Sequence, residues 1–327
     1  MSAPRFDVHA HLAGIGTGGS GCRVSPAFRR SLTFRALSRL HGMRADAPDA
    51  DAVWAARLAE RVRASEVDYA VALGFDGVYD RDGAPDLARS QMIVPHDWVF
   101  RVCRRHPELL PGPSINPHRR DALERLEECI EGGACLIKWL PATQGIDPAH
   151  PAHAAFYRRM ADARLPLLVH SGGSENTFRE IDPRLKELAL LFAPLRAGVP
   201  VIVAHLAAPV PFRRDPETLP LLRAMLDEFP NLWLDNSGMN NPARAGAIRR
   251  LAADPQLAER TLHGSDFPAP CGAVWHARRL GLARVRALTR IRNPLQRDIE
   301  IKRALGAPEA TLTRAASVLP NLPGAGS

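Results

Sequence analysis

Four histidines and one aspartate follow short apolar segments of the sequence. His9 and His11 end the segment RFDVHAH, while His170, His205 and Asp266 close LPLLVH, VPVIVAH and HGSD. Imidazole nitrogens and a carboxylate are ligands that zinc and similar divalent ions prefer. A single histidine after an apolar segment is more often a hydrogen-bonded core residue, so the prediction depends on the whole set. Together the five residues predict a site for one or two divalent ions.

The pair His9 and His11 is the most specific part of this pattern. Side chains two residues apart on a strand lie on the same face, and Asp7 would share that face. Two imidazoles buried without a partner would be costly, so packing alone explains the pair poorly. Asp7 is a candidate hydrogen-bond acceptor behind a ligand, or it could contact polar groups deeper in the core.

The spacing of the apolar segments indicates which elements position these residues. Amphipathic segments with helical periodicity separate them at 119–131, 151–163, 183–197, 217–229 and 243–253. Strands that alternate with helices pair in parallel, and eight such units predict a (β/α)₈ barrel of the α/β class. The alternative is an open, doubly wound sheet, although no G-x-G-x-x-G motif follows the first strand. The predicted strands are 5–10, 67–74, 109–115, 134–140, 165–170, 199–205, 231–236 and 260–265.

Two segments depart from the alternation, and we expect a single domain over residues 1–327. Residues 14–50 contain a glycine-rich loop at 14–21 and an arginine-rich amphipathic helix at about 26–41. The loop lacks the ending of a phosphate-binding P-loop, so we interpret 14–50 as an insertion over the barrel mouth. Residues 274–327 contain helical patterns and no strand, which predicts a helical tail.

The composition limits the classes of partner. The net charge is +8 and the pI is about 9.8, but the basic residues concentrate in amphipathic segments without a nucleic-acid recognition motif. We therefore expect solvated helix faces and no nucleic-acid partner. The apolar segments are too short for a membrane span, and the amino terminus lacks a signal-peptide pattern. Five scattered cysteines do not indicate a disulfide framework. We expect a cytoplasmic protein, with homo-oligomerisation left open.

The residues at the predicted strand ends resemble those of the amidohydrolase superfamily. The first strand carries H-x-H, the fourth a lysine, the fifth and sixth a histidine, and the eighth an aspartate. The segments LIKWLP, LLVHSGG, VIVAHLA and HGSDFP are similar to the amidohydrolase-related branch, sometimes called amidohydrolase 2. The resemblance covers about residues 5–270. It implies a metal-dependent barrel hydrolase or, in this branch, a nonoxidative decarboxylase or lactonase.

The resemblance also implies a role for Lys138, one of only three lysines among 43 basic residues. A neutral lysine amine can capture CO₂ as a carbamate that bridges two ions, whereas arginine is not neutral in practice. The alternatives are that Lys138 pairs with a substrate anion, or that it extends to the barrel rim.

Two arrangements of the metal ligands follow from the resemblance. With two metals, carbamylated Lys138 is the bridge and Asp266 takes the proton from the attacking water. With one metal, His205 acts on the water or substrate instead of binding the ion. We expect Zn²⁺, with Mn²⁺ as the alternative. The metal-ligand candidates are His9, His11, Lys138, His170, His205 and Asp266, and the catalytic candidates are Asp266, His205 and Lys138.

Residues near the predicted strand ends are candidates for contact with a small-molecule substrate. Packing and turn formation are equally reasonable roles for Trp139 and Asn236. Arg23 and Arg213 could recognise a carboxylate, although surface ion pairs are commoner for arginine. The principal candidates are Trp139, Gln144, Glu175, Asn240 and His263, with Asn176 and Asn236 beside them.

Three classes of function agree with these observations. The first is a hydrolase that uses a metal-activated water to cleave an amide, lactone or ester bond of a small carbonyl substrate, and we favour it because Lys138 is present. The second is a metal-dependent decarboxylase of an unsaturated or aromatic acid. The third is a basic binding protein whose barrel has lost catalysis.

Overall fold

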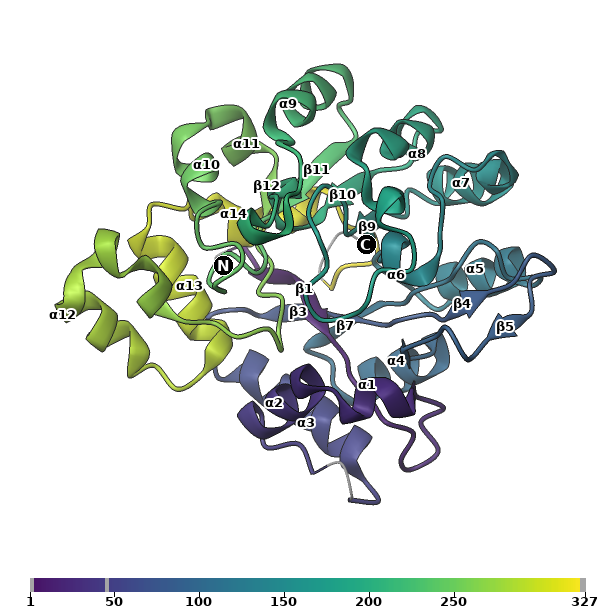
Figure 1. The fold of residues 1–327 in the computed structure, drawn as a ribbon, viewed down its shortest axis with the longest axis horizontal. Coiled ribbons are helices and arrows are strands. Elements are labelled where there is room, and N and C mark those ends of the chain that lie inside the picture. Colours follow the sequence, from purple (N-terminus) through teal and green to yellow (C-terminus); the bar gives the residue numbers. More distant parts are fainter. Residues whose placement is uncertain (1–2, 45–46, 324–327) are drawn as a thin grey trace.

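The computed structural model describes residues 3–44 and 47–323 and contains eight parallel strands at the predicted positions (Figure 1). Three of them form one sheet in the order β1, β3, β7, and five form a second in the order β8, β9, β10, β11, β12. Every pair of neighbours in these two sheets is parallel. The strands are β1 (Phe6–His11), β3 (Tyr69–Leu73), β7 (Leu109–Gly112), β8 (Ile137–Trp139), β9 (Leu167–Val169), β10 (Val201–Val203), β11 (Leu232–Asp235) and β12 (Thr261–Leu262).

Backbone hydrogen bonds join the two sheets at both pairs of edges. Between β7 and β8, the amide of Cys135 donates to the carbonyl of Pro111 at 2.8 Å. Between β1 and β12, the amide of Val8 donates to the carbonyl of His263 at 2.9 Å. The eight strands therefore follow one another in the order of a (β/α)₈ barrel, and the predicted fold class is confirmed.

Helices surround the strands, as Figure 1 shows. In α5, the buried residues Ala122, Leu126 and Cys129 follow the helical repeat, whereas Leu123 and Glu124 are exposed. The segment 183–197 is less regular than predicted, with two short 3₁₀ helices before α8. The surrounding helices are α3 (Ala50–Arg63), α4 (His96–Arg105), α5 (Ala122–Glu131), α6 (Pro141–Gln144), α7 (Ala154–Asp162), α8 (Phe192–Arg196), α9 (Leu219–Glu228), α10 (Ile248–Ala253) and α11 (Pro255–Glu259).

Side chains alternate between the interior of the barrel and the helices. In β10, Ile202 packs with the interior residues, while Val201 and Val203 pack in the cluster that faces the helices. β1 departs from this alternation, because Val8 and Ala10 are two residues apart but lie on opposite sides. Val8 is interior, whereas Ala10 packs in the outer cluster with α3. The register of β1 with β3 shifts between Asp7 and Ala10. Such irregularities re-aim side chains, and this one separates Asp7 from the histidine pair.

The insertion at 14–50 contains two helices instead of the single one predicted. α1 (Pro26–Arg30) is followed by Ser31, which is the N-cap of α2 (Leu32–Leu40). The Ser31 side chain accepts a hydrogen bond from the amide of Phe34. No residue of α2 is buried. Residues 45–46 of the insertion lie outside the described residues. Two unpredicted pairs of short antiparallel strands are β2 (Arg23–Val24) with β6 (Met92–Ile93), and β4 (Val78–Tyr79) with β5 (Pro85–Asp86).

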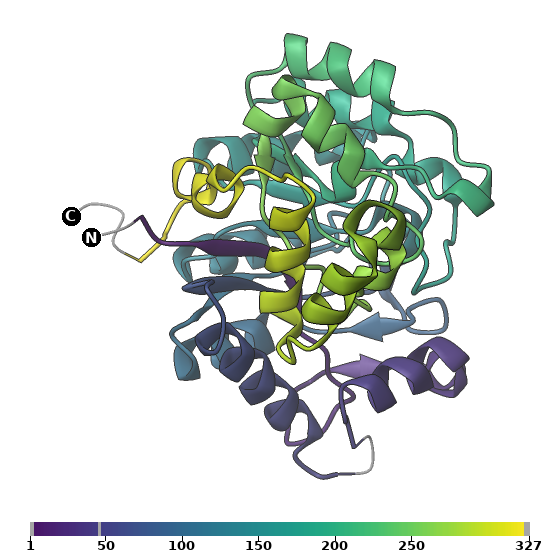
Figure 2. The same ribbon diagram turned by 90° about the vertical axis from the view of Figure 1, so that its left-hand side faces the viewer.

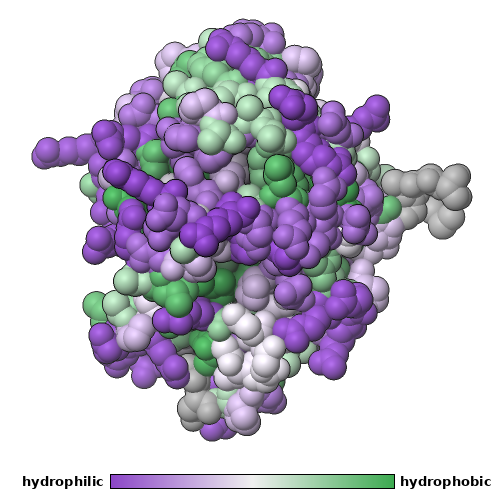
Figure 3. Space-filling view, turned by 90° about the vertical axis from the view of Figure 1, so that its right-hand side faces the viewer, coloured by the Kyte–Doolittle hydropathy of each residue, from purple (hydrophilic) through white to green (hydrophobic). Residues whose placement is uncertain are grey.

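The carboxy-terminal residues form the expected helices beside the barrel (Figure 2). They are α12 (Ala277–Thr289), α13 (Pro294–Ala304) and α14 (Ala310–Thr313), and the last predicted tail residues, 324–327, lie outside the described part. Within residues 3–44 and 47–323, no helix combines the length and apolar character needed to cross a membrane. Figure 3 shows a mostly hydrophilic face with hydrophobic side chains visible in limited areas. The single-domain organisation stays a prediction.

Candidate metal centre

The side chains of His9, His11 and Asp266 converge where β1 ends and the segment after β12 passes it. His9 Nε2 lies 3.2 Å from His11 Nε2, and Asp266 Oδ1 lies 3.6 Å and 3.5 Å from these two nitrogens. Three ligands about 2.1 Å from one tetrahedral zinc ion would be about 3.4 Å apart. The three donor atoms therefore have the spacing that a divalent ion requires.

Hydrogen bonding fixes the tautomer of His9 in the form that binds a metal. His9 Nδ1 lies 2.7 Å from Asp235 Oδ2, deep in the barrel. Burial and the nearby Lys138 lower the pKa of His9 to about 4, so the ring is neutral at neutral pH. Burial alone would raise the pKa of Asp235, but His9 and other partners hold it well below its usual range. Neutral His9 thus donates from Nδ1 to ionised Asp235 and leaves a lone pair on Nε2.

His205 belongs to the same cluster. One donor atom each of His9, His205 and Asp266 lies within 4.8 Å of the others, which makes these residues a possible metal-binding group. His205 Nδ1 lies 3.0 Å from the carbonyl oxygen of Ser237, so Nε2 carries its lone pair. The backbone of His205 is left-handed, with φ of 57°, and its amide donates to Asp235 Oδ1 at 2.9 Å. Such a backbone persists only where its surroundings hold it.

His170 lies beside His205, with ring centroids 5.0 Å apart. Both of its nitrogens contact its own loop, because Nδ1 is 3.4 Å from Glu175 Oε2 and Nε2 is 3.0 Å from the carbonyl oxygen of Gly173. The possible metal-binding group found among the described residues includes neither His170 nor His11, although His11 Nε2 lies 3.5 Å from Asp266 Oδ1. The role of His170 as a ligand stays a prediction.

Lys138 lies beside His9 in the same cavity. Its Nζ is 3.2 Å from His9 Nε2, and the side chain is buried, which argues against extension to the solvent at the barrel rim. Burial lowers the pKa of Lys138 to about 8, against the opposing effect of Asp235 and Asp266. The lowered pKa enlarges the neutral fraction of the amine at neutral pH. This neutral fraction is the form that can react with CO₂.

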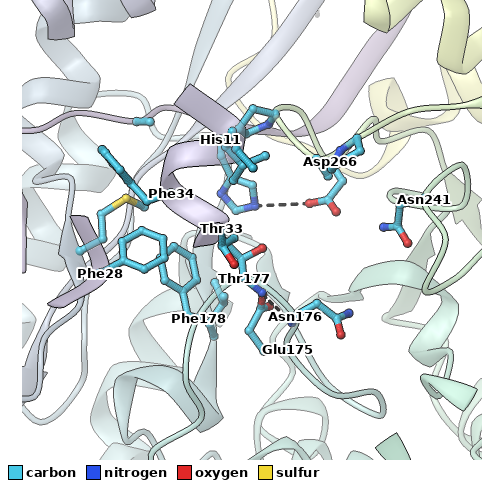
Figure 4. A pocket seen from close by; sticks show the side chains of 18 of the residues that line it. His11, Phe28, Thr33, Phe34, Glu175, Asn176, Thr177, Phe178, Asn241 and Asp266 are labelled. Atoms are coloured by element: carbon cyan, nitrogen blue, oxygen red, sulfur yellow. Dashed lines mark hydrogen bonds and ion pairs between the residues drawn. The ribbon is translucent and has the colours of Figure 1, made fainter. Parts of the chain in front are cut away.

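A cavity of about 320 Å³ opens above these residues. Its floor contains the metal-ligand candidates, and its walls are largely apolar. Phe28 and Phe34 from the insertion and Phe178 from the loop after β9 lie together on one side of it, across from Asp266 (Figure 4). Other apolar wall residues are Val24, Leu37, Met43, Trp54, Met92 and Leu140.

Arg244 is a cation in the cavity wall that the sequence did not single out. It is 5% exposed, and its Nη2 donates to the carbonyl oxygen of Ser174 at 2.9 Å. Its buried Nε has no hydrogen-bond partner among residues 3–44 and 47–323, and its Nη2 also lies 3.5 Å from His170 Nε2. Asp235 was also overlooked, although an acid at the carboxyl end of the predicted strand 231–236 is a recognisable signal.

Of the predicted substrate contacts, Glu175 and Asn176 line the cavity. The structure does not bring Trp139 to it, because Trp139 neighbours the inward-pointing Lys138 and therefore faces the helices. Its Nε1 donates to the carbonyl oxygen of Ile115 at 2.7 Å, and its ring packs near Phe156.

The other predicted contacts also lie away from the cavity. Gln144 Oε1 accepts a hydrogen bond from the amide of Leu140 at 2.6 Å, so it stabilises its own turn. Asn240 Nδ2 donates to Asp298 of α13, and the Asn236 side chain accepts from the amide of Gly264. His263 is buried and does not line the cavity, and Arg23 and Arg213 are exposed elsewhere.

Comparison with known proteins places the chain in a family. The amidohydrolase family model matches residues 6–307, so the chain belongs to this family, whose members are enzymes. The predicted family is confirmed. No curated protein sequence matches the chain significantly.

Solved structures with the same fold cover nearly the whole chain. One is an uncharacterised TIM-barrel protein from Bordetella bronchiseptica, 16% identical, with a TM-score of 0.57 over 96% of this chain and 99% of that one. A putative 2-pyrone-4,6-dicarboxylic acid hydrolase from Pseudomonas putida is 16% identical, with a TM-score of 0.53 over 98% and 96%. A 5-carboxyvanillate decarboxylase from Sphingomonas paucimobilis is 14% identical, with a TM-score of 0.52 over 97% and 100%. These similarities establish the fold and leave the reaction open.

Proposed function

We propose that this protein is a metal-dependent hydrolase that cleaves an amide, lactone or ester bond of a small carbonyl substrate. The observation that carries the proposal is the group formed by His9, His11 and Asp266, with donor atoms 3.2–3.6 Å apart. A divalent ion bound there, Zn²⁺ or Mn²⁺, would supply Lewis acidity and activate water. The family resemblance, with a lysine beside this group, favours hydrolysis.

Asp235, Asp266 and His205 would have separate roles in this reaction. Asp235 holds His9 in the tautomer whose Nε2 faces the site. Burial would raise the pKa of Asp266, but His11 and His9 lower it overall, so this carboxylate is ionised and can accept a proton from the attacking water. His205 offers its Nε2 to the same space, either as a ligand or as a hydrogen-bond partner of the water or substrate.

Lys138 would act as a carbamate in the two-metal arrangement. Its ammonium would first lose one proton, and the neutral amine would then form an N–C bond with CO₂ and lose a second proton, so that a cation becomes a carboxylate able to bridge two ions. Replacement by alanine should abolish activity, and short-chain carboxylic acids should restore part of it. Full occupancy by two metals in Lys138→Ala would contradict the bridge.

The cavity supports a substrate with an apolar body. One wall is formed by aromatic and aliphatic side chains, among them Phe28, Phe34 and Phe178, and the polar groups are concentrated at the metal end. A ligand would bury its apolar part against this wall and place its reacting carbonyl group near Asp266.

Arg244 supports a second candidate, a metal-dependent decarboxylase of an unsaturated or aromatic acid. A buried guanidinium whose Nε has no hydrogen-bond partner in the described part of the chain is suited to bind a carboxylate, and arginine does so with directed hydrogen bonds. Both a putative hydrolase and a decarboxylase occur among the structures of similar fold.

A direct comparison of the two reactions tests the proposal. The metal-loaded protein would be given aryl lactones, esters and amides in one series, and aromatic acids in the other, with acid release and CO₂ release measured. Turnover in the first series, lost in His11→Ala, supports the hydrolase, whereas CO₂ release alone supports the decarboxylase. Absence of bound metal after incubation with Zn²⁺ or Mn²⁺ would contradict both.

A further inference from the structure

The segment that carries Asp266 has a backbone that needs support. β12 ends at Leu262, and Asp266 has a left-handed backbone, with φ of 63°. A residue other than glycine in this conformation is strained unless its surroundings compensate. The position of the Asp266 carboxylate therefore depends on the contacts that hold residues 263–266.

Contacts from β1 hold part of this segment. The amide of Asp266 donates to the carbonyl of His9 at 2.8 Å, and the amide of Ser265 donates to Asp7 Oδ1 at 2.9 Å. Asp7 thus supports the segment after β12 instead of lying beside the metal-facing histidines.

A further contact comes from outside the barrel. Lys302 of α13 donates from Nζ to the carbonyl oxygen of Gly264 at 2.6 Å. Its Nζ also lies 2.6 Å from Asp298 Oδ2, one turn earlier on the helix, and Asp298 Oδ1 accepts from Asn240 at 2.8 Å. Lys302 is only 2% exposed, so its charge is paired in a buried environment.

The position of Gly264 constrains the metal-ligand candidates because Gly264 is tightly packed against His9. A Cβ atom on Gly264 would lie 2.7 Å from the Cβ of His9 and 3.0 Å from that of Ser237. A shift of this backbone would therefore displace His9 or move Asp266, which follows two residues later.

We propose that Lys302 is a positioning residue for the metal centre, so that α13 helps to determine where Asp266 lies relative to His9 and His11. Lys302 does not itself touch the proposed metal. It acts through the Gly264 carbonyl, and the proposal rests on the metal centre inferred above. It also assigns the carboxy-terminal helices a part in the site beyond covering the barrel.

Cobalt binding tests this proposal, because the visible absorption of Co²⁺ reports ligand geometry independently of turnover. Lys302→Met keeps the length of the side chain and removes its charge and hydrogen bonds. Partners behind metal ligands typically contribute 10–100-fold in metal affinity, so we expect Co²⁺ to bind at least about tenfold more weakly, with a shifted absorption band.

Arg314 offers a matched control. Its Nη1 donates to the carbonyl oxygen of Ala258 at 2.9 Å and also to that of Thr261 at the start of β12, farther along the chain from Asp266. Arg314→Met should lower the thermal stability but keep the Co²⁺ affinity within about twofold and the spectrum unchanged.

The outcomes separate this inference from the proposed function. If the wild-type protein binds no Co²⁺, the metal centre itself is refuted. If the wild type binds and Lys302→Met has the same affinity and spectrum, only the role of Lys302 is refuted. Should Lys302→Met fail to fold, Asp298→Asn, which keeps Lys302 but weakens its anchor, must change the Co²⁺ spectrum for the proposal to stand.

Discussion

Replacing Asp235 by asparagine should weaken metal binding, because an amide cannot satisfy all the groups around this carboxylate. Oδ2 lies 2.7 Å from His9 Nδ1, while Oδ1 accepts from the amides of His205 and Ser237 at 2.9 Å each. If the amide NH₂ faces His9, Nδ1 must accept and the proton moves to Nε2, where it blocks the metal. If the NH₂ group instead faces the backbone amides of His205 and Ser237, hydrogen-bond donors face one another and those hydrogen bonds are lost.

Either orientation of the amide carries a definite cost. The group that hydrogen-bonds the other ring nitrogen of a metal-bound histidine typically contributes 10–100-fold in metal affinity, which corresponds to about 1.4–2.7 kcal/mol. Loss of hydrogen bonds to a charged group should also lower the stability of the metal-free protein by about 1.5–3 kcal/mol. Zn²⁺ affinity would be measured by competition with a chelator, and stability by urea unfolding of the metal-free protein.

A second buried aspartate separates the two effects. Asp76 accepts hydrogen bonds from the amides of Gly77 and Asn116 but does not line the cavity. Asp76→Asn should lose comparable stability without a change in Zn²⁺ affinity. The reasoning is refuted if Asp235→Asn binds Zn²⁺ within twofold of the wild type while its stability falls like that of Asp76→Asn.

Three further predictions concern single side chains. Burial lowers the pKa of His153 to about 3, so the unfolded chain takes up a proton first as the pH falls below about 6.5. In urea titrations, the stability of the wild type relative to His153→Asn should therefore decline between pH 6.5 and 4.5. A constant difference in stability would contradict this prediction. Arg244→Met should weaken binding of benzoate at least about tenfold in calorimetry, whereas Arg250→Met, which breaks a surface pair with Glu217, should leave it unchanged. Phe34→Ala should weaken the binding of an aryl ligand by about 1 kcal/mol with little loss of stability, since Phe34 is half-buried. Equal weakening in the exposed control Phe212→Ala would refute a specific role of the aromatic cavity wall in ligand binding.

Much of the fold follows from local patterns. Each of the eight barrel strands was located by a short apolar segment, and a parallel barrel places the carboxyl ends of its strands at one face. His9, His11, His205 and Asp266 could therefore be placed together without coordinates. The break between α1 and α2 was missed because Ser31 lies within a continuous amphipathic pattern, and only its capping bond to Phe34 marks the boundary.

Substrate contacts were harder to predict, because one residue of difference along a strand reverses the direction of a side chain. Lys138 faces the cavity and its neighbour Trp139 faces the helices, although both are apolar-strand residues near the same end. The signal for Trp139 was its position beside a loop, which does not determine direction.

The sequence by itself determined the family and the barrel and predicted the donor groups, since these depend on periodicity and on residue type at strand ends. Only the tertiary structure decided which groups support the donors. Asp235 meets His9 across 226 residues, and Lys302 meets Gly264 across 38. Contacts of this kind depend on the relative placement of whole elements, and a local pattern carries no information about that placement.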